Sequence, residues 1–120
     1  WRVLLVHQPP YSRSWAGYDG DEAVRTIVRD LVGHGLQLVV SGHSHAYEHL
    51  VRAIAGRPLH VLITGGAGGG LEDPLATPVA EPDRVIVEHH FVRARTSGSA
   101  LTVEAVDRNG AVLDRWSLAR

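Results

Sequence analysis

Two histidines separated by one residue, His43 and His45, are the part of the sequence best suited to chemistry. They lie in the segment GHSHAYEH at residues 42–49, directly after an apolar run at residues 36–40. A third histidine, His7, follows another apolar run at residues 1–6. Imidazole is the commonest protein ligand for zinc, iron and similar ions. The sequence therefore predicts a metal site to which these three histidines contribute.

The predicted elements bring the three histidines to one edge of a sheet. Residues 1–6 and 36–40 are nearly continuous apolar runs, which predicts strands buried on both faces. Residues 22–34 carry apolar side chains at helical spacing. Strand, helix and strand of these lengths predict a right-handed β-α-β unit with parallel strands. The carboxyl ends of both strands then share the edge at which open α/β sheets bind ligands.

The predicted helix has a signal at each end. Asp19, followed three residues later by Glu22, resembles a capping box. Gly33 and Gly35 predict the end of the helix, because glycine readily takes the left-handed conformation that closes many helices.

The second half of the chain predicts antiparallel strands. Asp107–Gly110 is a hairpin turn with Asn-Gly at its centre, and residues 65–84 form a long loop rich in glycine and proline. The strands are expected at residues 47–54, 59–64, 85–95, 100–106 and 111–118. The predicted fold class is α/β, with a β-α-β unit followed by an antiparallel meander.

Composition restricts the classes of function. The chain has 120 residues, 44% of them hydrophobic and 21% charged, and a formal net charge of −1. This is typical of one globular domain and gives no signal for nucleic-acid binding. No run approaches the roughly 20 apolar residues of a membrane-spanning helix. The absence of cysteine excludes disulfides, thiolate metal sites and cysteine nucleophiles. The absence of methionine favours a segment of a longer protein.

Three segments together resemble the calcineurin-like metallophosphoesterases, and most closely their purple acid phosphatase-like branch. HQPPY at residues 7–11 matches the family pattern HxPxY, and GHSHAYE at residues 42–48 matches GHxHxYE. TGG at residues 64–66 matches the loop that follows in the family. The order and approximate spacing agree over most of residues 1–118. His49 departs from the pattern, which has arginine there.

The resemblance implies a phosphoester hydrolase with two metal ions, either divalent or iron with zinc or manganese, and a metal-bound hydroxide that attacks phosphorus. His7 and His43 would bind one metal and His45 the other. The remaining metal ligands of the family are aspartates and an asparagine, which lie in motifs upstream of these segments. The proton-donating histidine of the family also lies in such a motif, and this sequence contains none of these motifs. Residues 1–120 are therefore expected to be the C-terminal half of a two-sheet β-sandwich flanked by helices. The fragment is expected to be inactive alone.

Other residues receive supporting roles in this interpretation. The resemblance implies that Tyr47 and Glu48 orient the histidine loop, as outer carboxylates hold metal-binding imidazoles. Gly65 and Gly66 are expected either to line the pocket or to form a flexible connector. The loop carboxylates Asp19, Asp21, Asp73 and Asp83 are expected to be solvated and not to bind metal.

Two alternative functions compete with the metal site. GHSHA at residues 42–46 resembles the nucleophile elbow G-x-S-x-G of serine hydrolases, with Ser44 as the nucleophile and a helix after it at residues 46–55. Alanine in place of the last glycine weighs against this reading. A non-catalytic metal-binding β-sandwich module is the second alternative. The HxHxDH signature of metallo-β-lactamases does not fit, because Glu48 and His49 lie one residue too late.

Overall fold

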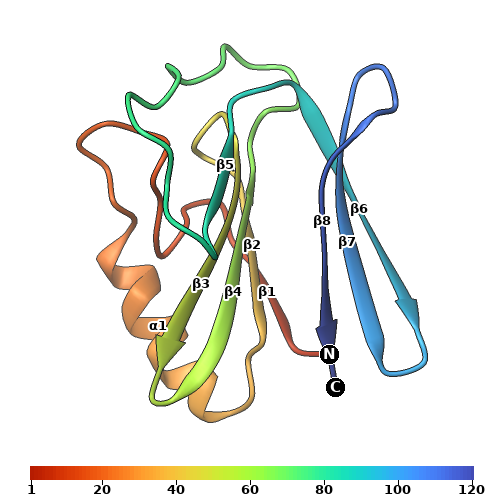
Figure 1. Cartoon of the computed structure of the whole chain (residues 1–120). Coiled ribbons are helices and arrows are strands. Elements are labelled where there is room, and N and C mark those ends of the chain that lie inside the picture. The colour runs from red at the N-terminus through yellow and green to blue at the C-terminus, as the bar shows by residue number, and fades with distance from the viewer.

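The computed structural model describes residues 1–120 and consists of two β-sheets that face each other, with one helix on the outer face of the larger sheet (Figure 1). The larger sheet has the strand order β1-β2-β4-β3-β5, and the smaller has the order β6-β7-β8. This arrangement confirms the predicted fold class. The elements are β1 Val3–Leu5, α1 Glu22–Gly33, β2 Leu38–Ser41, β3 Tyr47–Ile54, β4 Arg57–Thr64, β5 Arg84–Ile86, β6 His90–Ser97, β7 Ala100–Asp107 and β8 Val112–Ala119.

The β-α-β unit has the predicted topology. Strands β1 and β2 are parallel, with Val3 opposite Leu38 and Leu5 opposite Val40, and α1 connects them. Strand β4 is parallel to β2, whereas β3 is antiparallel to both of its neighbours. The loops that follow β1 and β2 therefore leave the sheet at the same end, which is the upper end in Figure 1.

Two apolar clusters, one on each face of the larger sheet, form the core. The alternation of side chains along β3 divides its residues between them, because successive side chains of a strand point to opposite faces. Leu50 packs under the helix, and Tyr47 packs between the sheets. Each fully buried apolar side chain contributes roughly 1.5–3 kcal/mol. The helix-side cluster contains Val24, Val28, Val32, Leu36, Val39, Leu50, Leu59, Val61 and Ile63, and the inter-sheet cluster contains Leu38, Tyr47, Leu62, Leu101, Val103, Ala105 and Leu118.

The helix begins at a different cap from the one predicted. Asp21 is the N-cap, and its side chain accepts a hydrogen bond of 2.9 Å from the backbone N–H of Val24. The predicted Asp19 contacts Arg25 instead. Asp21 is preferred because it lies three residues before a free N–H of the first turn, the spacing that an N-cap requires. At the other end Gly35 has φ +87°, the left-handed conformation expected for a closing glycine.

Two strand predictions are wrong in detail. Strand β1 is not buried on both faces, since Val3 is 43% exposed and Leu5 is 75% exposed. The strand lies at the edge of the larger sheet, and the smaller sheet does not cover these side chains. The strand predicted at residues 85–95 is two strands in different sheets, β5 and β6, separated at residues 87–89. Alternation alone does not reveal this break because both pieces alternate.

The remaining connections agree with the sequence. Residues 65–83 form a long loop without strands or helices. At the predicted hairpin turn, Asp107 accepts hydrogen bonds from the backbone of Asn109 and Ala111, and Gly110 has φ +89°. No helix in the structure has the length and apolar character needed to cross a bilayer.

Candidate functional site

His7 and His43 lie against each other where β1 and β2 end. Their ring centroids are 5.3 Å apart and the rings meet edge to face at 78°. Backbone hydrogen bonds continue the parallel pairing past the strands, from Val6 N to the Val40 carbonyl and from Gly42 N to the His7 carbonyl, both 3.1 Å. This continued ladder fixes the spacing of the two side chains.

The backbone of His43 is in an uncommon conformation. Its φ is +69°, a left-handed value that costs a residue with a Cβ of the order of 1 kcal/mol or more. Gly65 packs behind this turn, and a Cβ at Gly65 would lie 2.1 Å from the carbonyl oxygen of Ser44. Strain of this kind persists where the surroundings hold it, and it concentrates at functional sites.

His45 is held by a different part of the chain. Its Nδ1 lies 2.6 Å from the carbonyl oxygen of Gly70. Because a carbonyl can only accept, Nδ1 carries the proton, and Nε2 of the neutral ring has a free lone pair. Metal-binding histidines commonly have this arrangement. Gly69 packs on the ring, where a Cβ would lie 2.8 Å from it.

The chain alone does not assemble a complete metal site. No group of three or more histidine, cysteine, aspartate or glutamate side chains lies close enough together to hold an ion. The structure brings His7 and His43 together, but His45 turns toward the loop at residues 69–70. The nitrogen donors fit a zinc or iron centre in type, and they are incomplete in number.

Glu48 is fully buried, and its carboxylate is bonded to the loop that follows β1. The carboxylate accepts hydrogen bonds from the hydroxyls of Ser12 (2.8 Å) and Ser14 (2.7 Å), and from the backbone N–H groups of Arg13 (2.6 Å) and Ser14 (3.3 Å). None of these partners is an imidazole. Glu48 therefore fixes the loop after β1 and acts on the histidines only through that loop.

Tyr47 connects the two sheets. Its hydroxyl donates to Asp114 at 2.7 Å and accepts from the indole N–H of Trp116 at 2.9 Å, both on β8. Burial, followed by the hydrogen bond with Asp114, raises the pKa of Tyr47 far above its ordinary value. Its ring also packs edge-on against His90.

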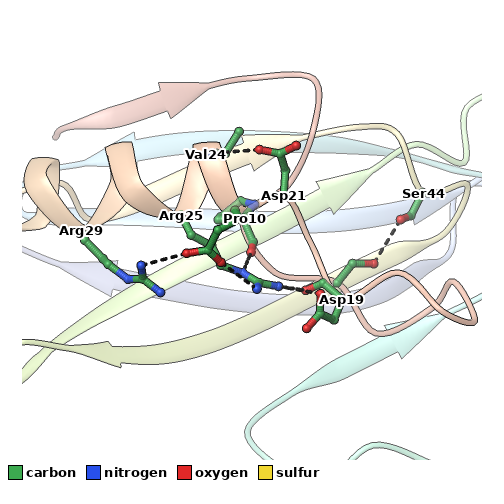
Figure 2. A network of polar contacts seen from close by, with 9 residues as sticks. Pro10, Asp19, Asp21, Val24, Arg25, Arg29 and Ser44 are labelled. Atoms are coloured by element: carbon green, nitrogen blue, oxygen red, sulfur yellow. Dashed lines mark hydrogen bonds and ion pairs between the residues drawn. The ribbon is translucent and has the colours of Figure 1, made fainter.

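The loop at residues 10–20, called the Trp15 loop below, is closed at its base by Arg25 of α1. The guanidinium donates to the carbonyl oxygens of Pro10 and Asp19, each at 2.6 Å, and pairs with the Asp19 carboxylate at 2.8 Å (Figure 2). Gly20 is required at the same point, since a Cβ there would lie 2.3 Å from the Pro10 carbonyl oxygen. Both ends of the loop are thus fixed to the helix and to each other.

Sequence reasoning missed Trp15 and Tyr18, which pack on His43 and are called the aromatic wall below. Their ring centroids each lie 5.1 Å from the His43 ring and 5.2 Å from each other. The Tyr18 hydroxyl is buried without a hydrogen-bond partner, and burial, with the nearby Asp21, raises the pKa of this tyrosine. Two aromatic residues among the small and charged residues at 12–20 were the signal that could have identified them.

The predicted pocket-loop glycines have packing roles. A Cβ on Gly66 would lie 2.7 Å from the ring of His90, and the Gly66 carbonyl accepts from His89 Nδ1 at 3.1 Å. Two further glycines of the same loop, Gly69 and Gly70, hold His45.

Asp83 is not the solvated carboxylate that was predicted. It is 7% exposed and accepts hydrogen bonds from Arg52 (2.8 Å) and from the backbone N–H of Val51 (3.1 Å). Burial acts to raise the pKa of Asp83, but these hydrogen bonds outweigh burial and lower it. Asp83 therefore anchors the start of β5 to β3.

The environment of Ser44 does not suit a nucleophile. The residue is fully buried, and its hydroxyl lies 3.1 Å from the Ser12 hydroxyl, not beside a histidine. Residues 47–54, predicted as part of a helix in the serine-hydrolase alternative, are strand β3. Nothing at Ser44 supplies the base that a serine nucleophile needs.

A second histidine pair lies between the sheets. His49 Nε2 is 2.9 Å from His60 Nδ1, and the His49 ring stacks on Trp116 with centroids 3.9 Å apart. His49 is only 7% exposed. His60 lies diagonally across from His49 on the neighbouring strand and is part of this stack.

Comparison with known proteins identifies similar sequences. No family model matches the chain. Over 88 residues, 68% of its length, the chain is 32% identical to purple acid phosphatase 18 of Arabidopsis thaliana. Over 97 residues it is 32% identical to purple acid phosphatase 1 of Ipomoea batatas. The chain spans about a fifth of the length of each of these relatives.

Proposed function

We propose that this chain supplies the histidine ligands of a metal-dependent phosphoester hydrolase. The premise is that the chain is purple acid phosphatase-like over about two thirds of its length. His7 and His43 would bind one ion and His45 a second. The observation that carries the proposal is the meeting of His7 and His43 at 5.3 Å, at the end of two parallel strands. The free Nε2 of His45 supports its part.

The three imidazoles cannot hold two ions without further ligands. A pair of ions separated by about 3.5–4 Å needs bridging oxygen ligands as well as nitrogen. The chain gathers no such group, and its buried carboxylates are engaged elsewhere: Glu48, Asp83, Glu104 and Asp107. We therefore propose that residues 1–120 work as the C-terminal part of a calcineurin-like phosphoesterase domain, whose N-terminal half supplies carboxylates.

The free edge of the larger sheet supports this division. Strand β1 has a neighbour on one side only, and its side chains Val3 and Leu5 are exposed toward the uncovered face. Unpaired edges with exposed apolar side chains are normally covered or protected in native proteins. A further segment placed against β1 would bury these side chains and would also approach His7.

The chemistry divides between the metal ions and the chain. When bound, two ions supply positive charge to the phosphoryl group and lower the pKa of water. His7, His43 and His45 fix where those charges lie. The Gly70 carbonyl holds the tautomer of His45, and the Trp15 loop shields one side of His43. The substrate is proposed to be a phosphoester, in keeping with the names of the relatives.

Metal binding by the 120-residue chain tests the ligand assignment. Titration with Co²⁺, followed by visible absorption and by NMR of the histidine rings, should perturb His7 and His43 together. His7→Ala and His43→Ala should each abolish that response. His34→Ala, at the end of α1, is the matched control and should not change it. Binding that persists in both variants would overturn the assignment.

Hydrolysis tests the division of the site. The purified chain should not turn over a chromogenic phosphomonoester, with or without added Zn²⁺ or Mn²⁺. Chelator-sensitive turnover by the chain alone would show that it needs no further carboxylates and would refute that part of the proposal. The Co²⁺ response of the histidines would be unaffected by that outcome.

A further inference from the structure

A cleft of about 440 Å³ opens between the Trp15 loop and the long loop that connects β4 to β5. Binding sites for small molecules commonly have volumes of about 300–1,000 Å³. Its residues come from two short segments, and its lining is mixed in polarity. The residues are Arg13, Ser14, Trp15 and Ala16 on one side, and Glu72, Asp73, Pro74, Leu75 and Ala76 on the other.

Both sides of this cleft are bonded to the segment that carries the histidines. Glu48 holds the backbone of residues 13–14 on one side. On the other side the backbone N–H of His45 donates to the Glu72 carboxylate at 3.0 Å, and the Glu72 N–H donates to the His45 carbonyl at 3.3 Å. The cleft therefore keeps a fixed position relative to His43 and His45.

Trp15 is the largest flat surface in the cleft. It is 41% exposed, although its ring packs against His43 on one side and Tyr18 on another. The loop that carries this indole is held by hydrogen bonds at its ends and in its interior. Such an indole is already ordered, so a ligand ring that stacks on it loses little additional conformational entropy of the protein.

We propose that Trp15 is a specificity-determining residue, which stacks on a planar aromatic leaving group while the phosphoryl group faces His43. This inference rests on the proposed function, because it places the scissile ester beside the histidines. The carboxylates of Glu72 and Asp73 line the opposite side. Together with Arg13 on the near side they leave one excess negative charge, which favours an uncharged ring, such as an aryl or nucleoside group, over a leaving group that carries further phosphates.

The size of the effect follows from stacking. Stacking of a base on an aromatic side chain contributes roughly 1–3 kcal/mol, which corresponds to about 5-fold to 150-fold in affinity. Phenyl phosphonate and methyl phosphonate differ by the ring and are not hydrolysed. With Zn²⁺ present, the 120-residue chain should bind phenyl phosphonate at least about 5-fold more tightly than methyl phosphonate, as measured by calorimetry. Adenosine 5′-phosphate should show whether a nucleoside ring is accepted as well as an aryl ring.

Variants separate this inference from the metal proposal. Trp15→Leu should remove the preference for the phenyl compound, Trp15→Phe should retain most of it, and Trp1→Leu, at the opposite end of β1, should leave it unchanged. Circular dichroism checks that each variant is folded. An unchanged preference in Trp15→Leu, or no binding of phenyl phosphonate at millimolar concentration, would overturn the inference. If His43→Ala no longer binds either phosphonate, this result supports the metal site independently. If the preference for the phenyl compound survives in His43→Ala, the metal role of His43 is refuted and only the stacking on Trp15 stands.

Discussion

Acidification should weaken the contact between the two sheets through His49. This ring stacks on Trp116 and faces His60, with 2.9 Å between facing nitrogen atoms of the two histidines. Only one of the two facing nitrogen atoms can carry a proton in that hydrogen bond. The contact therefore favours the neutral form of both rings. Burial first, and then the charge of His60, lower the pKa of His49 to about 4, although Asp114 and Asp83 act in the opposite direction. Burial also lowers the pKa of His60.

The direction and the size of this change in stability follow from proton linkage. Between about pH 6.5 and pH 4 the unfolded chain binds a proton at His49 and the folded chain does not, so stability falls as the pH falls. The interval from about 6.5 to about 4 corresponds to roughly 3 kcal/mol, at about 1.4 kcal/mol per pH unit. Water at the edge of the stack screens part of this, and we expect a loss of about 2 kcal/mol. Above pH 6.5 the contribution of this group does not vary.

Urea unfolding at a series of pH values, followed by circular dichroism, measures this loss. His49→Phe preserves a ring on Trp116 and removes the titrating group, whereas all carboxylates remain. The free energy of unfolding of the wild-type chain should fall more steeply than that of His49→Phe between pH 6.5 and 4, by about 2 kcal/mol in total. Parallel curves for the two proteins would refute the reasoning, because the carboxylates alone would then account for the pH dependence.

Three further predictions concern the sheet edge that carries His7 and His43 and the residues around it. Gly65→Ala should destabilise the chain by about 2 kcal/mol or more, because its Cβ would lie 2.1 Å from the Ser44 carbonyl oxygen; Gly68→Ala, in open space, is the matched control for urea unfolding. Glu48→Gln should cost about 1–3 kcal/mol and shift the fluorescence of Trp15, since it replaces an acceptor of four hydrogen bonds; an unchanged free energy of unfolding would contradict this. A fluorophosphonate probe should leave the buried Ser44 unlabelled, and mass spectrometry that finds the adduct would revive the serine-hydrolase alternative.

The sequence predicted the parts of the site that depend on strand topology. Apolar runs at β1 and β2 with a helix between them require parallel strands with a shared carboxyl edge, and His7 and His43 meet there. The hydrogen bond from His45 to Gly70 could not be predicted, because it depends on the path of a long loop. The same is true of the Trp15 loop, whose shape comes from side-chain bonds to Arg25 of the helix and to Glu48, which is distant in sequence.

The break between β5 and β6 shows a second feature that the sequence pattern alone does not predict. Residues 85–95 alternate as one strand would, yet the first part pairs with β3 and the second with β7. Local pattern gives the strand character of each part, whereas the sheet it joins is decided by partners elsewhere. Asp83 is such a partner, because its buried bonds to Val51 and Arg52 fix the start of β5.

The supports of His43 and His45 overlap at Gly65 and Ser44 but differ elsewhere, and this difference bears on how two ions could be bound. His43 depends on Gly65 behind its turn and on the aromatic wall that Glu48 holds in place. His45 depends on Gly70 and on no part of that wall. Because His7 packs with His43 and not with His45, the arrangement agrees with an assignment of the first two to one ion and the third to another. Changes at Glu48 should therefore weaken metal binding at the His7–His43 pair and spare His45, whereas a single shared ion would lose both together.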